Sequence, residues 1–511
     1  MLAPDTSTAG ASAAERELLV AEVRRFAGRH VDGNAIERAG RVPDEVVAGL
    51  RDLGAFGIAL PAEHGGSGLG VGDACAVVEE LARWDRSVAT MVGLHSGLGT
   101  RGIVSLARPD VAAAWLPRLA SGECIGAFAA TEACAGSDLM AMRTTARFEG
   151  DEIVLDGEKS YVTNGRFAGC YTVVARTGAR GHALVLVPRG TPGVAIGPEE
   201  HKLGIRASST VTLSFTNVRV PASHLLGSAE GGLDEAYAVL SWGRTVLASG
   251  CVGTMQAALD ATAQHVATRR QFRRTLGEFP AVRTRVAGMA AMLFAARAVT
   301  REAAEAIDRG APSDHPSMVA KIFASDRTFE VCDAAVQLHG ALGVLEDVGV
   351  ARLLRDCRVT RIFEGANDVL LLRIAAARLT KREAAPRVGT ASSHADGCDA
   401  VGALLDAAAD VLRTRYGAAV VAKQGVLLHL GRAEVAHAAA VASARAAGTR
   451  DSDADLADLA VRRLLGEARA ELDALAGCID VDRISARVAE RLYGAPPKDR
   501  PQAFARPEER P

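Results

Sequence analysis

The sequence predicts an α+β protein in which a helical unit, a β unit, a second helical unit and a helical extension follow one another. Apolar residues recur at helical spacing before about residue 125 and again after about residue 240. Between about residues 126 and 221 the pattern changes to the alternation of half-buried strands. The chain of 511 residues is also too long for a single hydrophobic core.

The first helical unit is expected over residues 1–125. Residues 15–27 have the pattern of an amphipathic helix, and Gly28 is a candidate C-cap. A second helix is expected at residues 43–53, because Pro43 suits a helix start and apolar residues follow at helical spacing. The helical pattern continues at residues 73–84 and 111–119.

The β unit is expected over residues 126–232 as a small antiparallel sandwich or barrel. Val211, Leu213 and Phe215 alternate with hydroxyl side chains, which predicts a strand with one buried face. The pairs Gly150-Asp151 and Asp156-Gly157 are turn signals between strands. Residues 173–175 and 183–187 are further strand candidates.

Helical spacing returns in residues 233–382, in long Ala-rich segments. Proline, glycine and serine between residues 379 and 399 indicate a linker to a last unit, residues 383–511, which is helical over residues 400–492. The first 14 residues and residues 495–511 are expected to be disordered or frayed.

Composition excludes several classes of protein. With 59 basic and 61 acidic residues there is no basic excess for nucleic acid, and no run reaches the ~18 apolar residues of a membrane span. The N-terminus has no apolar core of a signal peptide, and the nine cysteines form no CxxC pairs. A cytoplasmic protein with free thiols is expected.

Residues 361–368, with the sequence RIFEGAND, contain the candidate catalytic group. Glu364 precedes Gly365 and follows two apolar residues, so we expect its carboxylate at a backbone turn beside apolar side chains. Partial burial there raises a carboxyl pKa toward neutrality, which suits a general base. The alternative is a surface glutamate at a helix end with Gly365 as its C-cap.

Two further motifs flank the start of the β unit. Residues 128–138, FAATEACAGSD, combine small residues with hydroxyls on a turn, where backbone amides can approach a polar ring or phosphate. Residues 155–165 read LDGEKSYVTNG. Taken alone, the first is compatible with an ordinary β-turn and the second with a hairpin end. A glycine-rich loop at residues 61–68 lacks the lysine of a P-loop.

Together these motifs resemble those of the acyl-CoA dehydrogenase family. Its patterns TEPxAGSD, LxGxKxxITNG, RxQFG, QxxGGxG and RD…IxEGT have counterparts here in the same order, over residues 15 to about 380. The stretches 202–208 and 363–368 and the C-terminal extension are most similar to the very-long-chain branch. The resemblance implies FAD as cofactor, a four-helix bundle at residues 233–382 and a role in fatty-acid β-oxidation.

The resemblance also implies a role for each matching residue. Glu364 is the implied catalytic base, and the residues implied to bind substrate are Ser137, Arg244 and Gly365. The residues implied to bind FAD are Phe128, Thr131, Gly136, Ser137, Tyr161, Thr163, Arg269, Gln271, Phe272, Gln337, Gly340, Gly343 and Asp368. Arg269, Gln271 and Phe272 match a stretch that reaches the FAD of a neighbouring subunit, so a homodimer or homotetramer is expected.

The implied reaction removes a Cα proton from a long-chain acyl-CoA while a Cβ hydride goes to flavin, giving a trans-2-enoyl thioester. The implied electron acceptor is an electron-transfer flavoprotein or a similar partner. Acidic and basic residues are interleaved in the extension, which favours a solvated bundle that supports a dimer over peripheral membrane contact.

Four positions depart from the family's pattern, namely Ala133, Arg273, Ala341 and Ala366. Ala366 lacks a hydroxyl that normally helps to hold FAD, so somewhat weaker FAD binding is expected. Three alternatives keep the fold: a dehydrogenase for acyl chains on a carrier protein, a non-catalytic scaffold, and an oxidase. The retained Glu364, Thr131 and Thr163 argue against lost catalysis.

Overall fold

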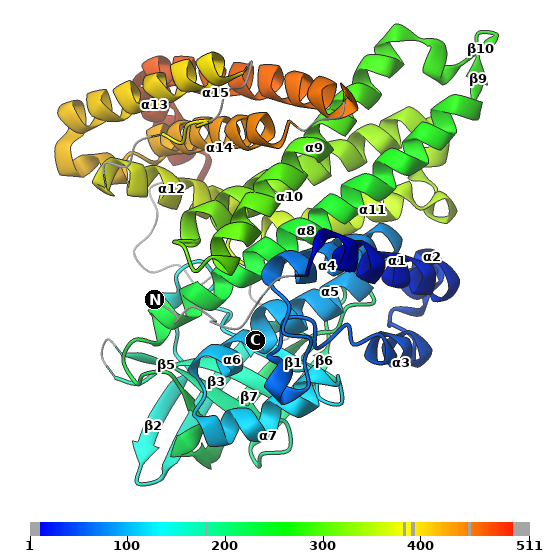
Figure 1. Ribbon diagram of the computed structural model, residues 1–511. Helices are drawn as coiled ribbons and strands as arrows, with labels where there is room; N and C mark the ends of the chain where they lie inside the picture. Colours follow the sequence, from blue (N-terminus) through cyan, green and yellow to red (C-terminus); the bar gives the residue numbers. More distant parts are fainter. Residues whose placement is uncertain (1–10, 179–180, 382–384, 390–393, 448–450, 494–511) are drawn as a thin grey trace.

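The computed structural model describes residues 11–178, 181–381, 385–389, 394–447 and 451–493. A β unit lies at one end of the molecule, long helices cross its middle, and the last helices pack on the far side of these (Figure 1). Among the described residues, no helix is long and apolar enough to cross a membrane. The tails expected to be disordered fall largely outside the described residues.

Seven α-helices of the described residues precede the β unit; the first, third, fourth and seventh lie close to predicted positions, and the other three were not predicted. The seven are α1 (Ala13–His30), α2 (Gly33–Ala39), α3 (Asp44–Asp52), α4 (Val71–Trp84), α5 (Arg86–Leu94), α6 (Arg101–Leu106) and α7 (Pro109–Ala120). The prediction of Gly28 as a C-cap is wrong, because α1 continues to His30. Gly28 instead lies against Trp84, where an added Cβ would approach the indole to 3.1 Å.

The β unit is a sheet in the order β6-β7-β3-β2-β4-β5-β8, with β1 paired to β4. Most pairings are antiparallel as predicted, whereas β1–β4 and one β2–β4 pair are parallel. Val211, Leu213 and Phe215 are buried in its core. The strands are β1 (Gly126–Ala129), β2 (Thr145–Glu149), β3 (Glu152–Thr163), β4 (Cys170–Arg176), β5 (His182–Pro188), β6 (Val194–Glu199), β7 (Thr210–Pro221) and β8 (Leu225–Leu226).

One of the two predicted turns is correct. Gly150 and Asp151 connect β2 to β3. The prediction of a turn at Asp156-Gly157 is wrong, because both residues lie inside β3 at a shift of register against β7. Gly157 has a φ of 144° there, and an added Cβ would lie 2.6 Å from Thr144. Glycine at position 157 therefore allows close packing of the strand and does not reverse the chain.

The second helical unit contains α8 (Gly232–Thr268), α9 (Pro280–Asp308), α10 (Asp314–His339), α11 (Val350–Arg358) and α12 (Asn367–Lys381). A short hairpin of β9 (Arg270–Gln271) and β10 (Arg274–Thr275) joins α8 to α9 and projects from one end of the molecule (Figure 1).

The extension consists of α13 (Ala395–Tyr416), α14 (Gln424–Ala446) and α15 (Asp451–Tyr493). It shares the hydrophobic core of the second helical unit, since Val435 and Leu464 are buried in one cluster with Val299 of α9. Arg378 of α12 donates to Glu434 of α14 at 2.6 Å, and both are buried. These contacts make the extension a continuation of the bundle.

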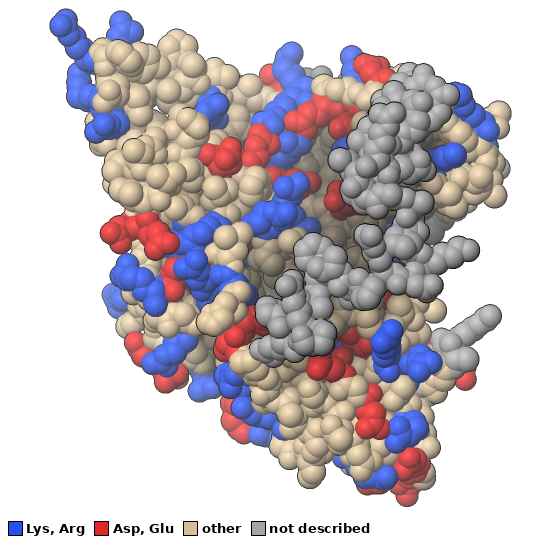
Figure 2. Space-filling model, turned by 180° about the vertical axis from the view of Figure 1, so that it is seen from behind, with Lys and Arg blue, Asp and Glu red and all other residues tan. Residues whose placement is uncertain are grey.

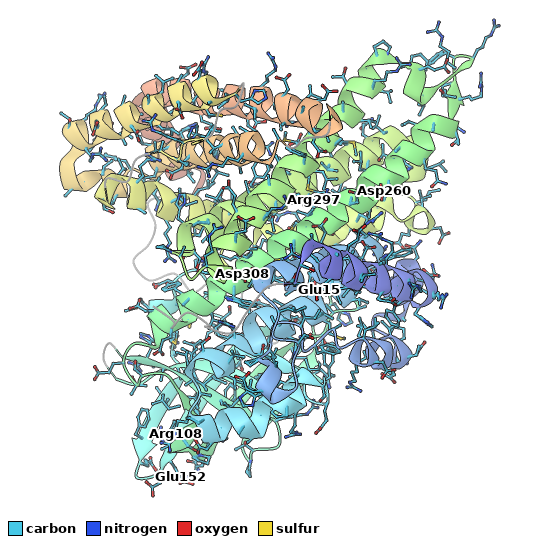
Figure 3. All side chains as sticks on the ribbon, in the orientation of Figure 1. Glu15, Arg108, Glu152, Asp260, Arg297 and Asp308 are labelled. Atoms are coloured by element: carbon cyan, nitrogen blue, oxygen red, sulfur yellow. The ribbon has the colours of Figure 1, made fainter. Side chains whose placement is uncertain are left out.

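The first helical unit is fixed to the bundle by polar contacts from α9 and α8 (Figure 3). Asp308 accepts the amides of Val71 and Gly72 at 2.7 and 3.0 Å, and so caps the N-terminus of α4. Further along α4, Arg297 of α9 pairs with Glu79 at 2.6 Å and Arg83 pairs with Asp260 of α8 at 2.8 Å.

A buried charge cluster joins all three units. Arg352 of α11 lies 3.1 Å from Asp85, which caps α5, and 3.4 Å from Asp356. Asp356 also accepts the amide of Ile205, from the loop between β6 and β7, at 2.5 Å. The three side chains are each at most 7% exposed. The relative position of β unit and helices therefore depends on a few buried polar contacts.

A second buried pair joins the two motifs at the start of the β unit. Lys159 of β3 is fully buried and lies 2.8 Å from Glu132, and it also donates to the carbonyl of Ala130 at 3.0 Å. Glu132 further accepts the amides of Arg143 and Thr144. The loop after β1 is thus held against β3 by a fully satisfied carboxylate.

Lys159→Met should destabilise the protein strongly, because it leaves Glu132 buried without its cation. We expect a loss of about 3 kcal/mol or more in the free energy of unfolding of the β unit. Arg219→Met, which removes an exposed ion pair with Glu149 and Glu152, should change it by less than about 1 kcal/mol. Denaturant titration of both variants measures the difference, and equal losses would contradict the role given to Lys159.

Candidate active site

Glu364 lies on a strained turn between a short 3-10 helix (Val359–Arg361) and α12. Its φ is 56°, in the left-handed region that residues with a Cβ seldom adopt, and Gly365 follows with a φ of 102°. The predicted turn is therefore present. Phe363 is half-buried beside the carboxylate as expected, whereas Ile362 is 54% exposed.

Two buried cations hold the backbone of this turn. Arg244 of α8 donates from Nε to the carbonyl of Glu364 at 3.1 Å. Lys321 of α10 donates from Nζ to the carbonyl of Gly365 at 2.7 Å and to Oδ1 of Asn367 at the same distance. Both cations are at most 2% exposed. A strained backbone persists where its surroundings over-determine it, and these contacts do so here.

The Glu364 carboxylate itself has no partner. Both of its oxygens are buried and accept no hydrogen bond within the described part of the chain, although the residue as a whole is half-buried. Burial raises the pKa of Glu364 to about 7, while the charges of Arg244, Lys321 and Arg86 act in the opposite direction. A carboxylate with these properties can accept a proton near neutral pH.

A small cavity of about 20 Å³ lies beside Glu364, between α4, α5 and α8. Gly243 of α8 is essential to its shape, because an added Cβ would lie 2.7 Å from Glu364 Oε2 and would collide with Leu98. Eleven residues line it: Val78, Arg86, Ala89, Thr90, Gly93, Leu94, Gly243, Val246, Leu247, Phe363 and Glu364.

The rim of the β unit lies close to this cavity. Gly126, at the start of β1, donates its amide to Nδ1 of buried His95 at 3.0 Å, three residues before Leu98. Asn164, at the end of β3, donates to the carbonyl of Met91 on α5 at 3.0 Å. Six predicted cofactor residues belong to β1, to the loop after β1 or to β3: Phe128, Thr131, Gly136, Ser137, Tyr161 and Thr163.

A second group of predicted cofactor residues lies at the opposite end of the bundle. The rings of His265 and His339 stack 4.3 Å apart, which places the end of α8 beside the end of α10. Arg269, Gln271, Phe272, Gln337, Gly340 and Gly343 belong to the segments that follow or end these two helices. Within one chain this group is far from the rim of the β unit (Figure 1).

The remaining predicted residues lie beside Glu364. Gly365 is the next residue of the turn, and Asp368 is exposed in the first turn of α12. Arg244 was expected near a thioester; the structure shows it bonded to the Glu364 carbonyl and to Asp314. Arg273, one of the four departures from the family's pattern, has a φ of 67°. This backbone conformation favours glycine.

Sequence reasoning missed Lys321, Arg86 and Lys159. Each is a charged residue inside an otherwise ordinary helix or strand, where a solvent-exposed position is the usual expectation. Helical spacing carried a partial signal for Lys321, because Val319, Ile322 and Phe323 around it are all buried. No comparable signal identifies Arg86.

Three family models match consecutive parts of the chain. The N-terminal domain of acyl-CoA dehydrogenase matches residues 13–123, the middle domain residues 127–218 and the C-terminal domain residues 230–379. The probable acyl-CoA dehydrogenase fadE25 of Mycobacterium leprae is 36% identical over 362 residues, which cover 70% of this chain and 93% of that protein.

Two other similarities concern the cofactor and the branch of the family. The mitochondrial very long-chain specific acyl-CoA dehydrogenase of Bos taurus is 34% identical over 70% of this chain and 56% of its own length. The crystal structure of an acyl-CoA dehydrogenase complexed with FAD from Bacillus anthracis is 25% identical, with a TM-score of 0.82 over 92% of this chain and 88% of that chain. The protein therefore belongs to the acyl-CoA dehydrogenase family of FAD-dependent oxidoreductases.

Proposed function

We propose that this enzyme removes the α-proton of an acyl-CoA thioester with Glu364 and forms the trans-2-enoyl thioester. The observation that carries the proposal is the unpartnered, buried Glu364 carboxylate beside a cavity, with a pKa of about 7. A Cα proton next to a thioester is weakly acidic, so its removal needs a carboxylate that is positioned and little solvated. FAD, when bound, supplies the hydride acceptor.

The turn itself contributes to the developing enolate. Among the described residues, no acceptor is bonded to the Glu364 N–H, which leaves this amide available to the thioester oxygen. Arg244 donates to the carbonyl of Glu364 and Lys321 donates to the carbonyl of Gly365. These two contacts fix the direction of the Glu364 N–H and of its carboxylate together. A preorganised donor of this kind stabilises negative charge as it forms.

The rim of the β unit fits a flavin. Tyr161 has a φ of 58° and is 58% exposed, so its aromatic side chain is available to pack against a ring. An added Cβ on Gly136 would meet nothing within 4 Å, so the loop around it borders open space. Thr131, Ser137 and Thr163 offer hydroxyls beside it. We assign the isoalloxazine ring to Tyr161 and Thr163, and the pyrophosphate to Gly136 and Ser137.

The length of the acyl chain is a further part of the proposal. The likeness to the very-long-chain enzyme supports the long chain predicted from sequence. The cavity favours a shorter one, since its volume of about 20 Å³ is far below that of usual ligand pockets and one of its lining residues is the charged Arg86. Gly93 lines the cavity, whereas Gly97 does not, and an added Cβ on Gly97 would lie 3.3 Å from Cα of Gly243.

We further propose a homodimer in which each chain completes its partner's FAD site, with an electron-transfer flavoprotein as electron acceptor. Large apolar side chains are exposed at the end of the bundle that carries the second group of cofactor residues. They are Phe272, Leu342, Val344, Leu345 and Val348, with exposures from 38% to 88%. Four exposed arginines flank Phe272, and Figure 2 shows basic side chains at this projecting end. The exposed apolar side chains suit contact with a second chain. The arginines suit the pyrophosphate of that chain's FAD.

Glu364→Gln should retain FAD and acyl-thioester binding and lose nearly all turnover, because the amide cannot accept the proton. Relative to the parent protein, the variant should become more stable to heat as pH rises from 4.5 to 7, because over this range the Glu364 carboxyl ionises in the unfolded parent but stays largely protonated in the folded one. Anaerobic bleaching of the flavin and thermal unfolding measure the two effects. An active Gln variant would exclude Glu364 as the base.

The rate constant of flavin reduction should rise with pH and level off above about 7. The folded-state pKa of Glu364 is about 7, so the reactive carboxylate is the minor form below that pH and the rate falls about tenfold per pH unit. Stopped-flow reduction at saturating substrate from pH 5.5 to 8.5 gives the profile. A rate that is constant across this range, or that falls with pH, would contradict the assignment.

Phe272→Asp should weaken the dimer and release FAD together, because it places a charge in the proposed apolar interface. Light scattering after size exclusion and the flavin absorbance of the same fractions measure both. Leu18→Asp is the control, since Leu18 is 68% exposed on α1, outside the proposed interface. A monomeric variant that keeps its FAD would show that the cofactor site is complete within one chain.

A further inference from the structure

Helix α10 holds the turn of Glu364 at two points. Lys321 donates to the carbonyl of Gly365 at 2.7 Å. Two helical turns earlier, Asp314 accepts from Nη1 of Arg244 at 3.3 Å, and Arg244 in turn donates from Nε to the carbonyl of Glu364 at 3.1 Å. Residues two turns apart lie on the same face of a helix. The position of the turn therefore depends on how α10 is placed.

Helix α12 starts directly after the turn, so its placement matters as well. Asn367 is its first residue and accepts from Lys321 at 2.7 Å. Further along α12, Arg373 donates to the second oxygen of Asp314 at 3.0 Å. Asp314 thus joins α10 to Arg244 of α8 and to Arg373 of α12. The geometry of the turn follows from the spacing of these three helices.

Glu434 of the C-terminal extension bridges α10 and α12. It lies on α14 and is 3% exposed. One of its carboxylate oxygens lies 2.9 Å from Nε2 of His315, the residue next to Asp314 on α10. The other oxygen accepts from Nε of Arg378, in the last turn of α12, at 2.6 Å. One buried carboxylate thus contacts both helices that hold the catalytic turn.

Glu434 is an ionised group at neutral pH. Burial raises its pKa, but the contacts with His315 and Arg378 outweigh burial and leave the pKa of Glu434 below its usual value. Hydrogen bonds to an ionised carboxylate are roughly twice as strong as those between neutral groups. The bridge between α10 and α12 is therefore directional and strong.

The extension fixes this bridge in space. Arg378 also donates to Asp406 of α13 at 2.9 Å, and Asp406 accepts the amide of Ala385 at 3.0 Å. Gly431 of α14 lies so close to α12 that an added Cβ would be 2.6 Å from the carbonyl oxygen of Leu371. Figure 1 shows α12 and α14 beside each other at the base of the extension. Helix α12 therefore has little freedom to move relative to the extension.

We propose that Glu434 is a positioning residue for the catalytic base and that the extension fixes the active-site turn through it. Glu434 places His315 and Arg378, and the helices that carry them hold the carbonyls of the turn. Glu434 takes part in no bond change. The inference rests on the function proposed above, and it adds a residue that lies beyond residue 379, where the matching family models end.

The proposal has a consequence for the basicity of Glu364. Burial is the main cause of its raised pKa, so a looser turn that admits water should lower this pKa toward the usual range. A weaker base removes the Cα proton more slowly. The charged groups that act on Glu364 are Arg244, Lys321 and Arg86, and all three stay in place when Glu434 or His315 is changed.

The first test measures flavin reduction against pH in Glu434→Gln. The FAD-loaded protein is mixed anaerobically with butyryl-CoA, octanoyl-CoA or palmitoyl-CoA, whichever bleaches the parent protein fastest, at saturating concentration. We expect a plateau rate about fivefold lower and a pH midpoint about one unit lower than in the parent. A loss of folded protein alone would lower the plateau and leave the midpoint unchanged, because the remaining folded molecules have the same turn.

His315→Gln tests the α10 side of the bridge and is the variant to use if Glu434→Gln does not fold. It should lower the midpoint in the same direction. His429→Gln is the matched control, because His429 is also a half-buried histidine beside a glutamate. Its Nδ1 lies 2.5 Å from Glu471 of α15, so this contact stays within the extension. The control should keep both the plateau and the midpoint of the parent.

Thermal unfolding gives a readout that needs no substrate. Glu364→Gln in the parent background should gain stability relative to the parent as pH rises from 4.5 to 7. In the His315→Gln background this gain should be smaller and should level off at a lower pH, because the folded-state pKa of Glu364 then lies closer to its unfolded value. Other titrating groups are common to both members of each pair, so the comparison isolates Glu364.

Two results would overturn the inference and leave the proposed function intact. One is an unchanged midpoint in both Glu434→Gln and His315→Gln, whatever happens to the plateau. The other is an equal shift in the control His429→Gln, which would show that any change in the extension acts on the turn. An active Glu364→Gln variant, or a parent protein whose flavin no acyl-CoA bleaches, would instead overturn the proposed function and the inference with it.

Discussion

The candidate active site depends on one strained turn and the two buried cations that hold it. Glu364 and Gly365 both have positive φ, and Arg244 and Lys321 bind their carbonyls. The same burial that lets these cations fix the backbone deprives the carboxylate of water and raises its pKa to about 7. Burial also lowers the pKa of Lys321 to about 7, whereas the negative charge of Glu364 raises it. The protonation of Lys321 is therefore linked to that of Glu364.

The position of this turn relative to the β unit depends on a second set of buried charges. Arg352 joins Asp85 to Asp356, and Asp356 holds Ile205 of the β unit. Glu132 and Lys159 then fix the loop that carries Thr131 and Ser137. These contacts are few and directional, so they set the distance between the rim of the β unit and Glu364 more tightly than apolar packing alone. The extension adds to the same core and strengthens the helical side of the site.

The cavity shows how a common framework is adapted by single residues. Gly243 leaves space for the carboxylate and Gly250 leaves space for Arg86, both on α8. Val246 and Leu247 between them give an apolar passage. Single residues of α8 therefore shape this cavity.

The sequence by itself determined the order of helical and β units, the position of several helices and strands, and Glu364 as the candidate base. These features are encoded locally, by hydrophobic periodicity, by turn residues and by short contiguous motifs. Only the tertiary structure decided the roles of Lys321, Lys159 and Arg86, and it corrected the predictions at Gly28 and at Asp156-Gly157. Arg244 and Glu364 are 120 residues apart, and Arg86 and Leu247 are 161 residues apart. Whether a charged side chain faces water or a buried partner depends on such distant contacts, which no local pattern records.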